Sequence, residues 1–223
     1  MEIKVVRKVL DVNMTMAEKN RKVFAKKKVF VLNVMSSPGS GKTAILEKTL
    51  SFIKPHIKCA VIVGDICTSN DAERLAGHGA PVVQINTDAF GGDCHLAAHV
   101  IENAADKIDM DDIDLLIVEN VGNLVCPAEF DIGEDARVVV LSVTEGEDKP
   151  LKYPLMFRKC DAAILNKTDL LPYLDYDRQE VVKNMLQIHP DMPVFEMSAK
   201  TQEGFGPWID WLKLMVSRKL KQL

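Results

Sequence analysis

Short apolar runs alternate with amphipathic segments along most of the chain. The runs are nearly continuous in Val, Ile, Leu and Ala, as in strands that are buried on both faces. We expect strands at residues 29–35, 59–63, 81–85, 114–118, 138–143, 162–165 and 194–197. Helices are expected at residues 44–50, 71–75, 94–107, 175–188 and 207–220. This alternation predicts an α/β fold in three layers, with helices on both faces of a mostly parallel sheet.

The beginning of the chain differs from the rest because it is rich in charge. Leu10, Met14 and Ala17 fall on one face of a helix, which predicts a short amphipathic helix leading into the first strand. We therefore divide the chain into an N-terminal helical extension, residues 1–28, and one α/β domain, residues 29–223.

A glycine-rich stretch, Ser-Ser-Pro-Gly-Ser-Gly-Lys-Thr, separates the first expected strand from the next helix. Its glycines allow the backbone to approach phosphate oxygens, and the N–H groups at the helix start attract an anion. Lys42 is expected to reach the β- and γ-phosphates and Thr43 to hold Mg²⁺. The pattern predicts a P-loop NTPase sheet, although Ser36 stands where the motif has glycine. The expected nucleotide-binding residues here are Pro38, Gly39, Ser40, Gly41, Lys42, Thr43 and Ala44.

Asn166-Lys167-Thr168-Asp169 follows directly on an expected strand and indicates a guanine base. The Asp169 carboxylate is suited to accept hydrogen bonds from N1–H and the 2-amino group, a donor pair that adenine lacks. We expect Lys167 to lie across the base and Asn166 to tie the motif to the phosphate loop. Ser198-Ala199-Lys200 closes a later strand and offers backbone N–H groups to the guanine O6. GTP is therefore the expected nucleotide, which disfavours a small-molecule kinase that uses the same loop.

Glu119-Asn120-Val121-Gly122 follows the strand that we expect to end at Val118. GTPases place an acidic residue and a glycine with this spacing so that the γ-phosphate recruits the glycine N–H and repositions the loop. We expect Glu119 to act in catalysis and at the Mg²⁺, and Gly122 to bind the nucleotide. Most GTPases have aspartate at the first position. Asn123 stands where rapid GTPases carry a water-positioning glutamine, which predicts slow intrinsic hydrolysis.

Three more acids follow the second expected strand. Asp65 ends this strand and is a candidate outer partner of the Mg²⁺. Asp71 is a candidate to orient the attacking water, and so joins Lys42 and Glu119 as an expected catalytic residue. A helix cap explains Asp71 equally well, because it opens a helix. Glu73 is a weaker candidate, since an exposed acid in a first helical turn explains it better.

Cys94-His95 and Cys126 are soft ligands that lie among Gly, Asp, Asn and Pro. Thiolate and imidazole together suit Zn²⁺ or Ni²⁺ and not Mg²⁺. Three ligands leave the coordination open, which fits either a labile site or completion by a second subunit. His99, which we expect on the same helical face as His95, is a fourth ligand, a support or, as the better explanation, an ordinary surface or core histidine.

Composition narrows the class of protein. The chain has 223 residues, of which 47% are hydrophobic and 27% charged, enough for one sizeable core. Its net charge of −4 provides no global basic field, so we expect neither nucleic acid nor a membrane as a partner. The absence of a long apolar stretch or signal-peptide core predicts a cytoplasmic protein. Five widely spaced cysteines predict buried thiols, such as Cys59 and Cys160, and possible metal ligands instead of a disulfide framework.

Several longer segments resemble one family. The phosphate loop, Thr87 to His95, Glu119 to Pro127 and Ser142 to Pro150 are similar to HypB, the GTPase that helps insert nickel into [NiFe]-hydrogenases. The resemblance runs from about residue 15 to the C-terminus and implies a SIMIBI-class GTPase domain over residues 29–223. Members of that family have the same residues at the two unusual positions, namely a serine at the start of the phosphate loop and a glutamate in the switch segment.

The resemblance implies a metallochaperone that hydrolyses GTP, dimerises with nucleotide and carries Ni²⁺ or Zn²⁺ at the dimer interface. The residues that match the family's metal site are Cys94, His95 and Cys126. Implied partners are a HypA-type nickel chaperone and the hydrogenase large-subunit precursor. Some members have an N-terminal Cys-x-x-Cys-Gly-Cys motif or a histidine-rich tract, and residues 1–28 have neither. This difference disfavours high-affinity binding or storage of nickel.

We hypothesise that GTP with Mg²⁺ orders the segment Glu119–Gly122 and so repositions Cys126. Metal affinity, nucleotide state and dimerisation are then linked. Two alternatives remain open: the related GTPase of urease nickel maturation, and a non-enzymatic nickel- or zinc-binding protein with a vestigial nucleotide site.

Overall fold

The computed structural model describes residues 4–65, 70–87 and 94–221, without the side chains of residues 4–9 and Asp65. Within these residues seven strands form one sheet in the order β3-β2-β4-β1-β5-β6-β7. The strands are β1 (Phe30–Ser36), β2 (Cys59–Asp65), β3 (Val82–Asn86), β4 (Leu115–Gly122), β5 (Ala136–Ser142), β6 (Ala162–Asn166) and β7 (Val194–Glu196). All neighbouring strands are parallel.

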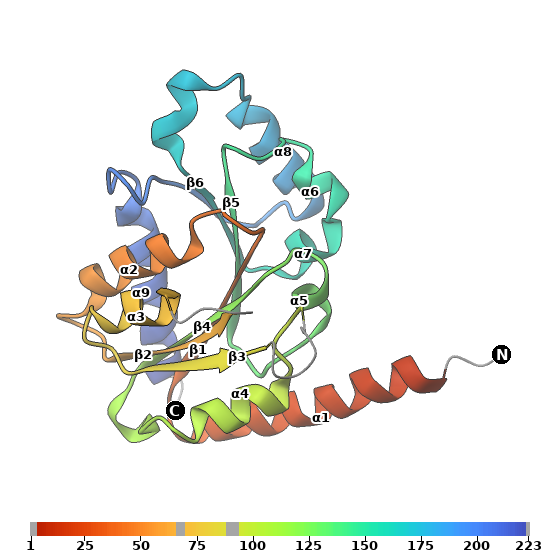
Figure 1. Cartoon of the computed structure of the whole chain (residues 1–223), viewed down its shortest axis with the longest axis vertical. Coiled ribbons are helices and arrows are strands. Elements are labelled where there is room, and N and C mark those ends of the chain that lie inside the picture. Colours follow the sequence, from red (N-terminus) through yellow and green to blue (C-terminus); the bar gives the residue numbers. More distant parts are fainter. Residues whose placement is uncertain (1–3, 66–69, 88–93, 222–223) are drawn as a thin grey trace.

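Helices cover both faces of the sheet (Figure 1). The α-helices are α1 (Lys4–Lys26), α2 (Lys42–Ile53), α3 (Asn70–Ala76), α4 (Ala98–Ala105), α5 (Cys126–Glu129), α6 (Lys149–Lys152), α7 (Pro154–Lys159), α8 (Arg178–Ile188) and α9 (Phe205–Lys221). Among the described residues, the connections also contain the 3₁₀ helices η2 (Met110–Asp112) and η3 (Thr168–Tyr173). No helix in the described part of the chain combines the length and the apolar character that a membrane span requires.

Alternate residues of the central strand β1 show how the layers pack. Leu32 points to the face covered by α2, α3 and α9. Val31 points to the opposite face and packs in the cluster under α1 and α4, whereas Met35 joins the cluster under α7 and α8. All three side chains are fully buried. The predicted three-layer P-loop fold is therefore confirmed, and the sheet is entirely parallel.

Helix α1 is longer than the short helix predicted and lies along α4 (Figure 1). The predicted contact face is wrong at Met14, which is 56% exposed. The buried face instead follows Asn13, Ala17, Asn20 and Phe24. Two asparagines on this face bind backbone groups of the domain, so its polar residues hid it from a search for apolar positions.

The helix expected at residues 94–107 begins only at Ala98, so Cys94 and His95 precede α4. His95 and His99 therefore do not share a helical face. Leu96 explains the wrong boundary, because its apolar side chain continues the helical pattern but packs against β2. A Cβ atom on Gly64 of that strand would lie 2.7 Å from Leu96 Cδ1.

Strand β4 continues to Gly122, past the end predicted at Val118. Glu119 pairs with Val34 and Gly122 with Ser36, across a register shift in the ladder. The polar side chains of Glu119 and Asn120 looked like a loop in the sequence, but both are buried in polar surroundings. The predicted switch segment is therefore the end of a central strand.

Candidate nucleotide site and metal residues

The phosphate loop connects β1 to α2 at the carboxyl edge of the sheet. Gly39 and Gly41 have φ angles of 74° and 91°, in the left-handed region that favours glycine. A Cβ atom on Gly41 would collide with the side-chain amide of Asn166. Gly122 lies against the same loop, since a Cβ atom there would be 3.2 Å from Pro38 Cα. The end of β4 is thus packed directly on the phosphate loop.

Glu119 contacts Lys42 and Thr43, the two side chains of the phosphate loop that were expected to bind phosphate and Mg²⁺. Lys42 Nζ lies 3.2 Å from Glu119 Oε1, and Thr43 Oγ1 donates to the same oxygen at 2.6 Å. The glutamate is 1% exposed. Burial raises the pKa of the Glu119 carboxyl, the Lys42 charge opposes the rise, and the negative charge of Asp71 adds to it.

Three buried oxygens in this region have no hydrogen-bond partner in the described part of the chain. They are Ser36 Oγ, Ser40 Oγ and Glu119 Oε2. An unsatisfied buried polar atom costs about 1–3 kcal/mol, so their gathering beside a glycine-rich loop fits missing ligand atoms. A carboxylate and the Thr43 hydroxyl are the hard oxygen ligands that suit Mg²⁺. The residues present therefore fit Mg²⁺ with a triphosphate.

Asn166 and Lys167, at the end of β6, are bound to the phosphate loop. Asn166 Nδ2 donates to the Ser40 carbonyl at 2.9 Å, and Lys167 Nζ donates to the Gly39 carbonyl at 2.7 Å. Asn166 Oδ1 accepts the Ala199 N–H at 3.1 Å. One buried amide thus ties the phosphate loop to both predicted base-binding segments, as the sequence predicts for Asn166.

Asp169 is held in place by the segment after β7. Its Oδ1 accepts the Ser198 hydroxyl at 2.7 Å, and Lys200 Nζ lies 3.9 Å from Oδ2. The backbone departs from the prediction here, because the amides of Ser198 and Ala199 already donate to Glu203 and Asn166. Of the three amides predicted to face a guanine O6, that of Lys200 has no acceptor within the described chain.

Asp71 lies in the first turn of α3, one residue after the helix start. Its Oδ1 lies 3.3 Å from Arg74 Nη1, and Arg74 also binds Glu47 of α2 at 2.7 Å. This ion pair, and not a helix cap, is the contact of the Asp71 side chain. Asp65 ends β2, but its side chain lies outside the described residues. Its predicted role at Mg²⁺ therefore stays a prediction.

Sequence reasoning missed Glu145 as a part of this site. Its carboxylate accepts hydrogen bonds from the Ser37 hydroxyl and, at 3.0 Å, from the Ser142 N–H. Glu145 follows β5 and so joins the neighbouring loop to the phosphate loop. Its place just after a central strand was the available signal, since that position puts it at the carboxyl edge.

The soft ligands are only partly brought together in one chain. Cys94 Sγ lies 3.8 Å from His95 Nδ1, and the His95 ring stacks on Phe130 with centroids 3.6 Å apart. Phe130 directly follows α5, whose first residue is Cys126. Among the described residues, however, no three His, Cys, Asp or Glu side chains converge as they must to hold a metal. His99 instead lines a hollow between α4 and β3.

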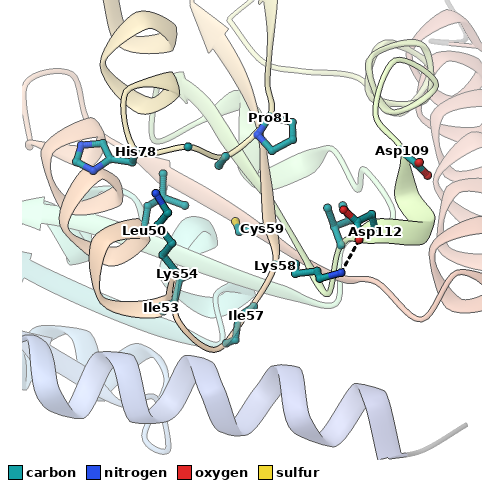
Figure 2. A pocket seen from close by; sticks show the side chains of 13 residues that line it. Leu50, Ile53, Lys54, Ile57, Lys58, Cys59, His78, Pro81, Asp109 and Asp112 are labelled. Atoms are coloured by element: carbon teal, nitrogen blue, oxygen red, sulfur yellow. Dashed lines mark hydrogen bonds and ion pairs between the residues drawn. The ribbon is translucent and has the colours of Figure 1, made fainter.

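A separate hollow of about 320 Å³ lies at the opposite edge of the sheet, where β2 begins (Figure 2). Leu50, Ile53 and Ile57 supply apolar lining, and Lys58 forms an ion pair with Asp112 at its rim. None of the residues expected to bind nucleotide or metal lines it. The candidate site is therefore the loop edge described above.

Comparison with known proteins gives a consistent set of relatives. Residues 30–196 match the family model "CobW/HypB/UreG, nucleotide-binding domain". The chain is 50% identical over 205 residues to the hydrogenase maturation factor HypB of Escherichia coli (strain K12), covering 92% of this chain and 70% of that protein. The probable hydrogenase maturation factor HypB of Methanocaldococcus jannaschii is 40% identical over 212 residues, 95% of each chain. The crystal structure of HypB from Helicobacter pylori in complex with nickel matches with a TM-score of 0.86 and 39% identity, covering 93% of this chain and 96% of that one.

Proposed function

This chain belongs to the HypB hydrogenase maturation factors of the CobW/HypB/UreG nucleotide-binding family, and on that premise we propose that it hydrolyses GTP to control the delivery of nickel to a [NiFe]-hydrogenase. One observation carries the proposal. Glu119 contacts both Lys42 and Thr43, and the same continuous segment leads from it to Cys126. A residue of the expected nucleotide site and an expected metal ligand thus lie in one short segment, residues 119–126.

The positions of the side chains support the following nucleotide chemistry. Asp169 accepts the guanine N1–H and 2-amino group, Lys167 covers the base, and Lys42 binds the β- and γ-phosphates. The residues that would hold Mg²⁺ are Thr43 with Glu119 and Asp65, and the ion neutralises phosphate charge when bound. Asp71 orients the attacking water, which yields GDP and inorganic phosphate.

Nickel is the cargo in this proposal. Cys94, His95 and Cys126 bind Ni²⁺ or Zn²⁺, and a second copy of the chain completes the coordination in a GTP-state homodimer. The close match to a HypB structure in complex with nickel supports the choice of metal. We propose that the protein acts in the cytoplasm, between a HypA-type nickel chaperone and the hydrogenase large-subunit precursor.

Phosphate release tests the enzymatic part of the proposal. We expect slow Mg²⁺-dependent release from GTP, little from ATP, and loss of at least about 10²-fold in Lys42→Ala. Lys48→Ala, on the same helix but outside the loop, is the matched control. No release from GTP would favour the non-enzymatic metal-binding alternative. Nickel transfer to an apo hydrogenase precursor, compared with an apo urease, separates the two maturation roles.

A further inference from the structure

A chain of buried polar side chains begins beside Glu119 and crosses two strands. Asn120 Nδ2 on β4 donates to Asn33 Oδ1 on β1 at 3.1 Å. Asn33 Nδ2 donates to Glu134 Oε1 at 3.3 Å. The three residues are 1%, 0% and 7% exposed. Polar groups at such depth are retained only when each has a partner, and here each partner is the next member of the chain.

The chain continues from Glu134 to the helix that carries Cys126. Arg137 Nε donates to Glu134 Oε1, and Arg137 Nη1 donates to the Ala128 carbonyl at 3.4 Å. Ala128 lies in α5, two residues after Cys126. The other carboxylate oxygen of Glu134 accepts the Ile132 N–H at 2.8 Å. Glu134 therefore fixes both the arginine and the backbone that follows α5.

The segment between the two anchors is partly buried, since Val121 is 4% exposed and Leu124 is 5% exposed. It is held at Asn120 by Asn33 and at Ala128 by Arg137, and between them Val125 is 54% exposed. A shift of the β4 end can thus reach α5 by two routes: along the backbone between β4 and α5, and through the buried side chains. The second route is stiff because breaking any buried link leaves an unsatisfied group, at about 1–3 kcal/mol.

We propose that Arg137, set by the relay Asn120–Asn33–Glu134, is a positioning residue that transmits the nucleotide-dependent position of the β4 end to the Cys126 helix. This inference rests on the proposed function, because it supplies the physical link between the nucleotide and metal sites. Asn33 and Arg137 are register partners on adjacent strands, so the relay runs straight across the sheet.

The experiment compares Zn²⁺ affinity with GDP and with a non-hydrolysable GTP analogue. Coupling free energies between sites correspond typically to affinity ratios of roughly 5–150. In the double variant Glu134→Gln with Arg137→Leu, the hold on Ala128 is lost and no buried charge is left unpaired. We expect its ratio to fall to within about twofold of one, while its guanine affinity and its affinity in the GDP state stay near wild type.

Two variants control this result. Glu134→Gln alone retains a hydrogen-bond acceptor for Asn33 and Arg137 and loses the acceptor of the Ile132 N–H just as the double variant does, so it is expected to retain most of the wild-type ratio. Arg158→Leu removes an exposed arginine from α7 and is expected to change nothing. If the double variant fails to fold, Arg137→Lys replaces it, because lysine lacks the two separate nitrogens with which Arg137 binds Glu134 and the Ala128 carbonyl.

The outcomes separate the inference from the function on which it rests. A wild-type ratio well away from one that persists in the folded double variant, or in Arg137→Lys, overturns the relay and leaves the proposed function standing. A wild-type ratio of one contradicts both the coupling and the relay. Loss of the ratio in the double variant with its retention in Glu134→Gln supports the relay.

Discussion

In the proposed function, the choice of nucleotide depends on Asp169. Its carboxylate is 13% exposed and already ordered by Ser198 and Lys200, so little rearrangement is needed when a base binds. A pre-positioned acceptor favours the ligand that brings two donors and penalises one that leaves it unpaired.

Exchanging this carboxylate for an amide is expected to change the preferred base. In Asp169→Asn the new side chain presents a donor and an acceptor, which suits xanthine with its 2-carbonyl group. GTP affinity is expected to fall by roughly 10²–10⁴-fold while XTP affinity rises. Competition binding with both nucleotides measures this, and Asp177→Asn, at the cap of α8, is the matched control. Unchanged GTP affinity would remove Asp169 from the base site.

Glu119 has the opposite character, because it is a buried acid whose surroundings favour protonation in the protein without ligands. Burial raises its pKa above 4.5 despite Lys42. The stability associated with the protonated form is therefore present below about pH 4.5 and is lost as the pH rises through the folded-state pKa. At neutral pH the ionised carboxylate of Glu119 therefore lowers the stability of the protein without ligands.

Glu119→Gln is therefore expected to raise the stability of the protein without ligands and to lower its rate of GTP hydrolysis. Relative to wild type, its Tm should be higher at pH 8, and the difference should vanish near pH 4.5. GTP hydrolysis should fall by about 10²-fold or more, because a carboxylate ligand is lost. Thermal unfolding at both pH values, with and without Mg²⁺ and a GTP analogue, measures this. A variant less stable than wild type at pH 8 would contradict the assignment.

At the scale of the elements, the hydrophobic pattern predicted the strands whose formation depends mainly on burial of apolar side chains. The seven strands were predictable because each is rich in apolar residues, and the positions of the motifs were predictable because each motif follows a strand. The ends were not. Leu96 continues a helical pattern that the backbone does not follow, and Glu119 and Asn120 extend a strand with polar residues whose partners lie far away in the sequence.

Hydrogen bonds between side chains that are far apart in the sequence could not be predicted either. Glu145 binds Ser37 across more than 100 positions of sequence, and Asn33 reaches Glu134 in the same way. Neither pair has a spacing or composition that marks it before the strands are placed side by side. The phosphate loop could be located from the sequence because its spacing is a local property of one loop, whereas these supporting contacts depend on how the strands are placed in the sheet.

Helix α1 illustrates the same point and yields a prediction. Asn20 Nδ2 donates to the carbonyls of Ala98 and Ile132 at 2.8 and 3.1 Å, and Asn20 is 2% exposed. Asn20→Ala leaves these carbonyls without their donor, so the free energy of unfolding should fall by about 2–3 kcal/mol. Urea denaturation measures this, with the exposed Lys22→Ala as the control. A change below about 0.5 kcal/mol would indicate a helix that is independent of the domain.

At the scale of the whole molecule, the sheet order brings distant loops to one edge. β1 lies between β4 and β5, so the phosphate loop is flanked by the segments that carry Glu119 and Glu145. β6 adds the guanine motif on the side of β5. The soft ligands follow a different pattern, since the described residues of one chain do not assemble three of them. In the proposed function a second copy of the chain supplies the remaining ligands.

Size-exclusion chromatography with metal analysis tests this assembly. With a GTP analogue and Zn²⁺ or Ni²⁺, we expect the wild-type chain to elute as a metal-bearing dimer, and with GDP to shift towards the monomer. Cys126→Ser should retain guanine binding but carry roughly half the metal or less, because each ion then has too few ligands. Cys160→Ala is the matched control, since that thiol is buried and burial raises its pKa. Metal bound at full wild-type content by monomeric Cys126→Ser would contradict a ligand set shared between two chains.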